Sequence, residues 1–182
     1  MSALSVVLED GDVRLEPLAS HHVEPLRAAC ARDAEIWEIY PVSMLGEQFD
    51  VATEEFHATA DWVRFAVLHR GVLVGMTCYI KPDERNHAVE IGGTYIEPAA
   101  RGPAGVNATM KRLMINHAFA CGFTRIEFRV DARNLRSRAA VLKLGATHEG
   151  VLRKNRITWT GHVRDTCVFS LLSHEWPVRP NE

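Results

Sequence analysis

No CxxC pair occurs among the four cysteines of the 182-residue chain, which are Cys30, Cys78, Cys121 and Cys167. They lie far apart among apolar neighbours, which indicates reduced, mostly buried thiols and a reducing compartment. No cysteine has an adjacent histidine or another activating motif, so nothing in the sequence favours nucleophilic catalysis by a thiolate.

A long apolar run is also absent, because nowhere do about 18 apolar residues follow one another. The N-terminal stretch MSALSVVLEDGD has no positively charged segment of the kind that begins a signal peptide. We therefore expect a soluble, cytoplasmic protein without a membrane partner. Lysine and arginine number 21 against 23 aspartate and glutamate, so the chain offers no broad basic surface to nucleic acid. Any phosphate site must be local.

Repeats, low-complexity tracts and long linkers are missing as well, so we predict a single domain over residues 1–182. A hydrophobic content of 47% is enough for one core. Alternating and β-branched runs predict strands over residues 12–18, 63–69, 72–80, 87–96, 125–130, 146–157 and 163–172. The order of these elements predicts an α+β fold with a largely antiparallel sheet.

The most regular helical pattern covers residues 106–121, where Lys111, Arg112 and Asn116 are predicted to face away from the apolar side. Ser20 is predicted to cap a helix that runs to about residue 32, and Asn134 a second helix that ends near residue 145. A less regular helical region lies between them, over residues 37–62. Residues 87–130 thus form one central strand-loop-helix-strand unit.

The loop of this unit, RGPAGVNATMK at residues 101–111, combines two glycines and a proline with a helix start and has no acidic residue. A helix N-terminus offers unpaired backbone N–H groups and a partial positive charge, so the loop is a candidate anion site. Its glycine spacing matches neither the P-loop nor the dinucleotide fingerprint. The plain alternative is a turn that leads into a helix. The preceding strand contains Gly92-Gly93, which indicates a bulge or a close backbone approach.

Taken together, three motifs resemble the core of the GNAT superfamily, the acyl-CoA-dependent N-acyltransferases, and in particular its branch of ribosomal-protein alanine N-acetyltransferases. The motifs are EIGGTYI at 90–96, RGPAGVNATMKRLMINHAF at 101–119, and NLRSRAAVLKLGA with EGVLR within 134–153. The order of elements extends the resemblance from about Asp12 to Trp176. It implies a mixed, mostly antiparallel central sheet that is flanked by helices and has splayed central strands.

The resemblance also implies a coenzyme A site, in which loop amides bind the pyrophosphate and the glycine-marked strand binds the pantetheine arm. Arg101 lies one place before the first position of the family pattern [QR]xxGx[GA]. It is expected to face a phosphate, with a solvated loop cation as the alternative. The expected cofactor-binding residues are Thr94, Tyr95, Ile96, Arg101, Gly102, Ala104, Gly105, Val106, Asn107 and Asn134.

Acyl transfer from a thioester to an amine needs a neutral amine, a stabilised oxyanion and a proton for the thiolate, but no metal. Glu90, in an otherwise apolar strand, is the leading general-base candidate, with His87 as second choice and an ion pair with arginine as the structural alternative. Many relatives use a tyrosine acid where this chain has Val141. The resemblance places Ser137 near the coenzyme A sulfur as a catalytic residue that would donate a hydrogen bond or a proton. For Asn134 and Ser137, a role in starting the helix is the alternative.

Trp37 and Tyr40 fall in the region where the family has its acceptor groove, and we predict substrate contacts there, with core packing as the alternative. His21-His22 lies at a helix start without metal-ligand spacing, so we expect no metal.

We therefore predict an N-acetyltransferase that carries an acetyl group from acetyl-CoA, or another short acyl-CoA, to a primary amine by direct attack in a ternary complex. The acceptor is a protein N-terminus or a small-molecule amine. The alternatives are a non-catalytic acyl-CoA-binding or sensing module and a plain nucleotide-binding domain. A homodimer through the late hairpin stays open.

Overall fold

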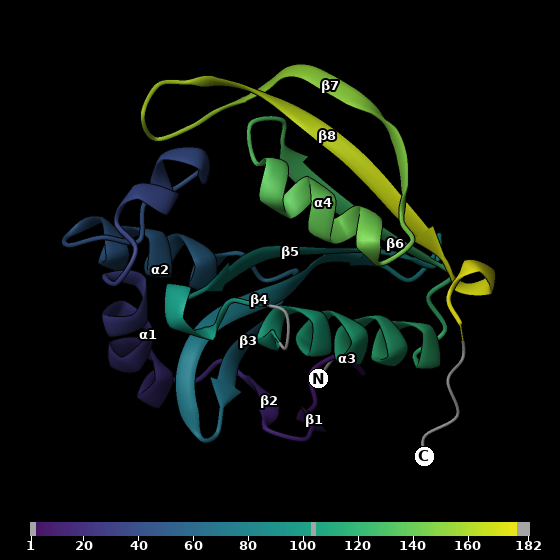
Figure 1. Cartoon of the computed structure of the whole chain (residues 1–182), viewed down its shortest axis with the longest axis horizontal. Helices are drawn as coiled ribbons and strands as arrows, with labels where there is room; N and C mark the ends of the chain where they lie inside the picture. Colours follow the sequence, from purple (N-terminus) through teal and green to yellow (C-terminus); the bar gives the residue numbers. More distant parts are fainter. Residues whose placement is uncertain (1–2, 103–104, 178–182) are drawn as a thin grey trace.

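The computed structural model describes residues 3–102 and 105–177. Within them, one eight-stranded sheet has the strand order β1-β2-β3-β4-β5-β6-β8-β7. The strands are β1 (Leu8–Asp10), β2 (Val13–Pro17), β3 (Trp62–His69), β4 (Val72–Asp83), β5 (Ala88–Ile96), β6 (Arg125–Asp131), β7 (Thr147–Ile157) and β8 (Val163–Leu172). The helices are α1 (Val23–Cys30), α2 (Gln48–Ala58), α3 (Val106–Ala120) and α4 (Leu135–Lys143), with short 3₁₀ segments η1 (Ser20–His22), η2 (Glu35–Ile39), η3 (Pro98–Ala100) and η4 (Ser173–Glu175) (Figure 1).

All neighbouring strands are antiparallel except β5 and β6, which are parallel. The chain joins these two through η3 and α3, as a parallel pair requires a crossover connection. The predicted α+β fold, with a mostly antiparallel sheet flanked by helices, is confirmed.

Two hydrophobic clusters cover the two faces of the sheet. One joins α3 and Val141 of α4 to alternate residues of the strands, among them Phe65, Tyr79, Val89, Ile91, Ile126, Phe128 and Phe169. The other joins α1, η2 and α2 to the opposite side of the β3–β5 region, through Trp37, Phe49, Ala66, Met76 and Tyr95. Figure 1 shows α1 and α2 together at one side of the molecule, away from the β7–β8 hairpin strands.

The β3–β4 hairpin turns at the predicted place. Arg70 and Gly71 have φ angles of 53° and 75°, which are the two positive values that a type I′ turn requires. The register shifts by one residue between Leu68 and Val67, and beyond this irregularity Val67 and Phe65 of β3 point into the cluster that contains α3.

Two local predictions were wrong. Ser20 caps no α-helix; it begins the 3₁₀ turn η1, and α1 starts only at Val23. The imidazole of His22 takes over part of the capping, because its Nδ1 accepts the N–H of Ala19 at 3.1 Å. Strand β1 was not expected, since its three residues include two charged ones, and it forms by pairing with β2.

Among the described helices, none combines the length and the apolar character needed to cross a membrane.

A very close backbone approach in the sheet occurs at Gly75 of β4. A Cβ atom there would lie 2.0 Å from the carbonyl oxygen of Tyr95 and 3.0 Å from the Cα of Ile96, both backbone atoms of β5. Only glycine lets β5 lie this close to β4.

We expect Gly75→Ala to destabilise the protein by roughly 2–4 kcal/mol, because the backbone of β5 must move to admit the methyl group. The control is Gly11→Ala, where φ is +56° but no atom lies within 4 Å of the added Cβ. That variant should lose only about 1 kcal/mol through its left-handed backbone. Urea unfolding measures both, and equal losses would contradict the close approach at Gly75.

Candidate active site

The sheet opens between β5 and β6. These strands pair only from Ala88 to Glu90, opposite residues 125–127. Beyond Glu90, β5 stays paired with β4, through a register shift between Met76 and Cys78, while β6 stays paired with β8. Gly93 has a φ of +57°, so the bulge at this point needs glycine. We call the divergence between residues 91–96 of β5 and 128–131 of β6 the wedge.

Glu90 lies where the wedge begins. Its side chain is 20% exposed, and its Oε2 is 3.5 Å from Nε of Arg129. The carboxylate extends over Gly92, where a Cβ would lie only 2.9 Å from Glu90 Oε1. Burial raises the pKa of Glu90, and the charge of Arg129 opposes this only in part. A carboxylate in this environment suits the acceptance of a proton near neutral pH.

Cations flank Glu90 on the same face of the sheet. Arg156 of β7 lies directly opposite Arg164 of β8, and like charges at such a position destabilise an antiparallel pair. Arg164 is buried and donates to Thr166 Oγ1 at 3.0 Å and to the carbonyl of Arg129 at 3.3 Å. Arg156 makes no ion pair within the described residues. Arg164 also lies 3.9 Å from Asp131 Oδ2, and Glu127 lies opposite Glu90, so this face carries charges of both signs.

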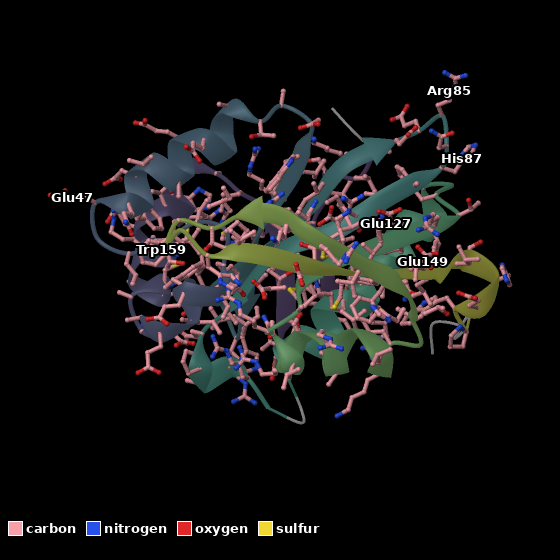
Figure 2. All side chains as sticks on the ribbon, turned by 90° about the horizontal axis from the view of Figure 1, so that it is seen from above. Glu47, Arg85, His87, Glu127, Glu149 and Trp159 are labelled. Atoms are coloured by element: carbon pink, nitrogen blue, oxygen red, sulfur yellow. The ribbon has the colours of Figure 1, made fainter. Side chains whose placement is uncertain are left out.

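His87, the second base candidate, lies elsewhere. It is exposed at the turn before β5, with a φ of +49°. Figure 2 shows it beside Arg85 at the outer end of the sheet, pointing away from the molecule. Of the two candidates, the structure thus brings only Glu90 to the wedge.

Lys111 contradicts its predicted place on the solvent side of α3. It is only 6% exposed, and its Nζ donates to Thr94 Oγ1 at 2.8 Å. The same nitrogen lies 5.9 Å from the ring centroid of Phe128. Thr94 and Phe128 belong to β5 and β6, so the ammonium group lies at the wedge between them. Burial lowers the pKa of Lys111 to about 7, against the opposing influence of Cys78 and Glu90.

The position of Lys111 on α3 already indicated burial, because Ile115 and Ala118, four and seven residues further along, lie on the same side of the helix and are fully buried. The prediction followed the charge of the side chain and not this position. A four-carbon stem lets the ammonium follow an apolar surface well away from its own Cα.

The three predicted pantetheine contacts on β5 lie along the wedge with their backbone groups already engaged. The carbonyl of Thr94 accepts the Tyr40 hydroxyl at 2.5 Å, and the carbonyl of Ile96 accepts Nε of Arg101 at 2.6 Å. The side chain of Tyr95 is buried and donates to a carbonyl of α1. Side chains thus take the places that a neighbouring strand would have filled.

Arg101 is turned toward the body of the protein. Besides its bond to Ile96, its guanidinium lies 2.6 Å from Asp33 Oδ2 and 5.7 Å from the ring centroid of Tyr95. The structure therefore gives Arg101 a carboxylate partner, and a phosphate-facing role stays a prediction.

The remaining loop residues form the start of α3. Gly105 precedes the helix, and a Cβ on it would lie 2.2 Å from the carbonyl oxygen of Gly102. Ala104 lies outside the described residues. Val106 and Asn107 open a first turn that has no acidic residue and no side-chain cap, and within the described residues their N–H groups have no partner, which suits an anion.

Asn134 and Ser137 form the expected helix start. The Asn134 side chain caps α4 by accepting the backbone N–H of Ser137 at 3.0 Å. Val141, one turn further along, is buried in the cluster with α3, so a tyrosine hydroxyl is replaced by packing. Coenzyme A contacts of Asn134 and Ser137 stay predictions.

Trp37 is fully buried, whereas Tyr40 is partly exposed beside it. The ring centroids of the two lie 4.9 Å apart, and Trp37 Nε1 donates to the carbonyl of Cys30 at 3.2 Å. Trp37 therefore supports Tyr40 and offers no surface of its own in this structure. Trp159 holds the hairpin tip against this segment, donating from Nε1 to the carbonyl of Trp37 at 2.7 Å and from its backbone N–H to Pro41 at 3.1 Å. We call these two bonds the clasp; Figure 2 labels Trp159 at the tip.

One group of potential metal ligands gathers within the described residues, namely Glu16, His21 and His22, whose ligand atoms lie within 4.8 Å of one another. Nδ1 of His22 already accepts a backbone N–H, and its Nε2 lies 3.4 Å from Glu16 Oε2. A proton on Nε2 satisfies this pair without an ion. That the protein uses no metal remains an expectation.

A family profile described as an acetyltransferase (GNAT) domain matches residues 12–147. The chain belongs to the GNAT acetyltransferase family. The predicted superfamily, its fold and the class of acyl-CoA-dependent N-acetyltransferases are thereby confirmed. Among the curated proteins, none matches the chain.

Solved structures agree with this GNAT assignment. A protein from T. thermophilus that is assigned as an acetyltransferase is 33% identical, with a TM-score of 0.85 over 94% of this chain and 91% of that one. RimJ of Mycobacterium smegmatis, in complex with CoA-disulfide, is 18% identical, with a TM-score of 0.82 over 96% and 91%. The microcin C7 self-immunity acetyltransferase MccE, in complex with acetyl-CoA and AMP, is 18% identical, with a TM-score of 0.78 over 90% and 93%. The last two likenesses show the fold alone.

The buried charge in this GNAT domain predicts an unusual effect on stability. Replacing Lys111 by Met removes a desolvated ammonium group, so Lys111→Met should be more stable than the wild type by about 1–4 kcal/mol. The folded-state pKa of about 7 lies below the ordinary value of 10.5. The charge therefore costs most below pH 7, where both states are protonated, and the cost disappears as the pH rises toward the ordinary value.

Urea unfolding at about pH 6 and about pH 9 tests this dependence. The control is Lys143→Met, an exposed lysine on α4, which should stay within about 0.5 kcal/mol of wild type at both values. If Lys111→Met is less stable than the wild type at the lower pH, the ammonium group does not destabilise the folded state.

Proposed function

We propose that the protein transfers an acetyl group from acetyl-CoA to a primary amine, either a protein N-terminus or a small-molecule amine, by direct attack in a ternary complex. The observation that carries the proposal is Glu90, a partly buried carboxylate of raised pKa at the start of the wedge. A base there can take the proton of an amine that approaches an acyl group held between β5 and β6.

The donor site follows from two separate features. Within the described part of the chain, the N–H groups of Val106 and Asn107 in the first turn of α3 have no partner and the turn contains no acidic residue, which suits the pyrophosphate of coenzyme A. The wedge offers the backbone of β5 to the pantetheine arm, once the side chains of Tyr40 and Arg101 release the carbonyls that they now bond. The complexes of RimJ with CoA-disulfide and of MccE with acetyl-CoA support an acyl-CoA donor.

In the reaction, the amine nitrogen attacks the thioester carbonyl carbon, and the carbon–nitrogen bond forms as the carbonyl oxygen becomes an oxyanion. Backbone N–H groups near Gly92 and Gly93 would stabilise that oxygen. Glu90 takes a proton from the nitrogen, directly or through water. The carbon–sulfur bond then breaks, and the thiolate of coenzyme A leaves and takes up a proton.

Binding of the donor is tested first by thermal unfolding with acetyl-CoA, using ATP and NAD as controls. A ligand that binds only the folded state stabilises it by about 2.7 kcal/mol at a hundredfold excess over Kd. Stabilisation by acetyl-CoA, and not by the controls, is the expected result. Release of free thiol in the presence of an amine then separates an enzyme from a sensing module, which would bind acetyl-CoA without turnover.

For the base, Glu90→Gln should lower the rate of thiol release by about 10²–10⁴-fold. The wild-type rate should rise with pH as Glu90 loses its proton, and this rise should begin above the ordinary range of a glutamate because burial raises the pKa of Glu90. The Gln variant should lack this rise.

The matched control for Glu90 is Glu127→Gln, which removes the carboxylate paired opposite Glu90 on β6. Because the charge of Glu127 raises the pKa of Glu90, this variant should keep turnover and shift the rise to lower pH. A Glu90→Gln enzyme with wild-type rates at every pH would remove Glu90 from the mechanism.

A further inference from the structure

The ammonium group of Lys111 is a buried charge without a counter-ion. Its side chain is 6% exposed, and it forms no ion pair within the described residues. One N–H donates to Thr94 Oγ1, which is held in turn by the hydroxyl of Thr77 at 2.8 Å. The other two donors of Nζ have no acceptor in the described part of the chain. Burial of an unpaired charge is costly, so a lysine in this position indicates a functional role.

Lys111 and Glu90 approach the wedge from opposite sides of the sheet. Val89 and Ile91 point into the cluster with α3, so Glu90, which lies between them on β5, points to the other face. Lys111 comes from α3 itself and reaches Thr94, four residues further along the same strand. An acyl group held in the wedge would thus have a carboxylate on one side and an ammonium group on the other.

We propose that Lys111 is the catalytic acid that protonates the sulfur of coenzyme A as it departs. This assignment rests on the function proposed above. The amine attacks from the side of Glu90, which receives one proton from its nitrogen. As the carbon–sulfur bond breaks, its electron pair stays on sulfur, and a proton moves from Nζ of Lys111 to that sulfur. The neutral lysine regains a proton from solvent before the next turnover.

Burial makes Lys111 a stronger acid than a lysine in water. Its pKa is lowered from 10.5 to about 7, so it gives up a proton more readily at neutral pH. The groups that face the ammonium are the Cys78 thiol of β4, the Glu90 carboxyl of β5 and the Phe128 ring of β6. Of these, Cys78 and Glu90 act to raise the pKa of Lys111, and burial outweighs both.

The position also accounts for the missing tyrosine. Val141 is packed into the core where many relatives carry their acid, and the hydroxyl of Ser137 is a much weaker acid than an ammonium group. Lys111 supplies a proton from a different helix, α3, to the same place between the strands.

Titration of the thiol of bound coenzyme A tests the proposal without any acceptor. Thiolate absorbance is followed against pH for free coenzyme A bound to the wild type, to Lys111→Met and to Lys143→Met. A neighbouring ammonium should lower the pKa of the bound thiol by about 1–3 units in the wild type and in Lys143→Met. In Lys111→Met the thiol should titrate as it does in water. Equal pKa values in all three proteins would overturn the proposal, as would a failure of coenzyme A to bind.

Turnover separates an acid from a merely nearby charge. Lys111→Met should lower kcat by about 10²–10⁴-fold while KM for acetyl-CoA changes by less than about threefold. The wild-type rate should fall as Lys111 loses its proton above about pH 7, and this fall should be absent in the variant. Lys111→Arg, which keeps the charge but holds its proton, should restore the low thiol pKa and not the rate.

An unchanged kcat in Lys111→Met would exclude the catalytic role. If the wild type releases no thiol with any amine, the proposed function fails, and the thiol titration alone still decides whether Lys111 faces the sulfur.

Discussion

The contact between Gly75 of β4 and the backbone of β5 is the constraint from which the site follows. The carbonyl of Tyr95 lies where any side chain at position 75 would begin, so β5 follows β4 closely through its second half. At the same time, Gly93 lets the strand bulge, and pairing with β6 stops after three residues. A parallel pair that is cut short in the middle of a sheet leaves unpaired backbone groups, which must find other partners. Tyr40 and Arg101 provide them.

The polar groups around this opening are held at a cost to the fold. A carboxylate and an ammonium group are both desolvated there, from opposite faces. Glu90 forms an ion pair with Arg129 at 3.5 Å, the structural alternative expected from the sequence, whereas Lys111 forms none within the described residues. Two arginines are also placed opposite each other on β7 and β8. Natural proteins break the rules of stability mainly where function requires it. Such destabilising arrangements gather around residues 90–94 and therefore indicate a functional site there more clearly than any single motif does.

Local sequence patterns were sufficient to predict most helices and strands, but not the contacts of the side chains at the candidate site. The β3–β4 turn, the bulge near Gly93 and the Asn134 cap each depend on a few consecutive residues, and their chemistry could be predicted. The pairing of Arg101 with Asp33 joins residues that are distant in sequence, and no periodicity encodes it. Lys111 was missed because its charge was taken as a sign of exposure, although Ile115 and Ala118 mark its side of α3 as buried. Strand β1 likewise exists only through its partner.

The clasp at the hairpin tip has a consequence for how the protein can diverge. Both of its hydrogen bonds run from Trp159 to main-chain carbonyls, those of Trp37 and Pro41. They therefore do not depend on most of the side chains between residues 37 and 41. Apart from Trp159 and the buried Trp37, the residues of η2 and of the turn after β7 can therefore change during evolution while the two segments stay joined. Neither η2 nor the turn after β7 is part of α3 or of strands β4 to β6, which form the wedge. Related proteins could thus differ in the side chains beside Tyr40 while the residues of the wedge stay the same.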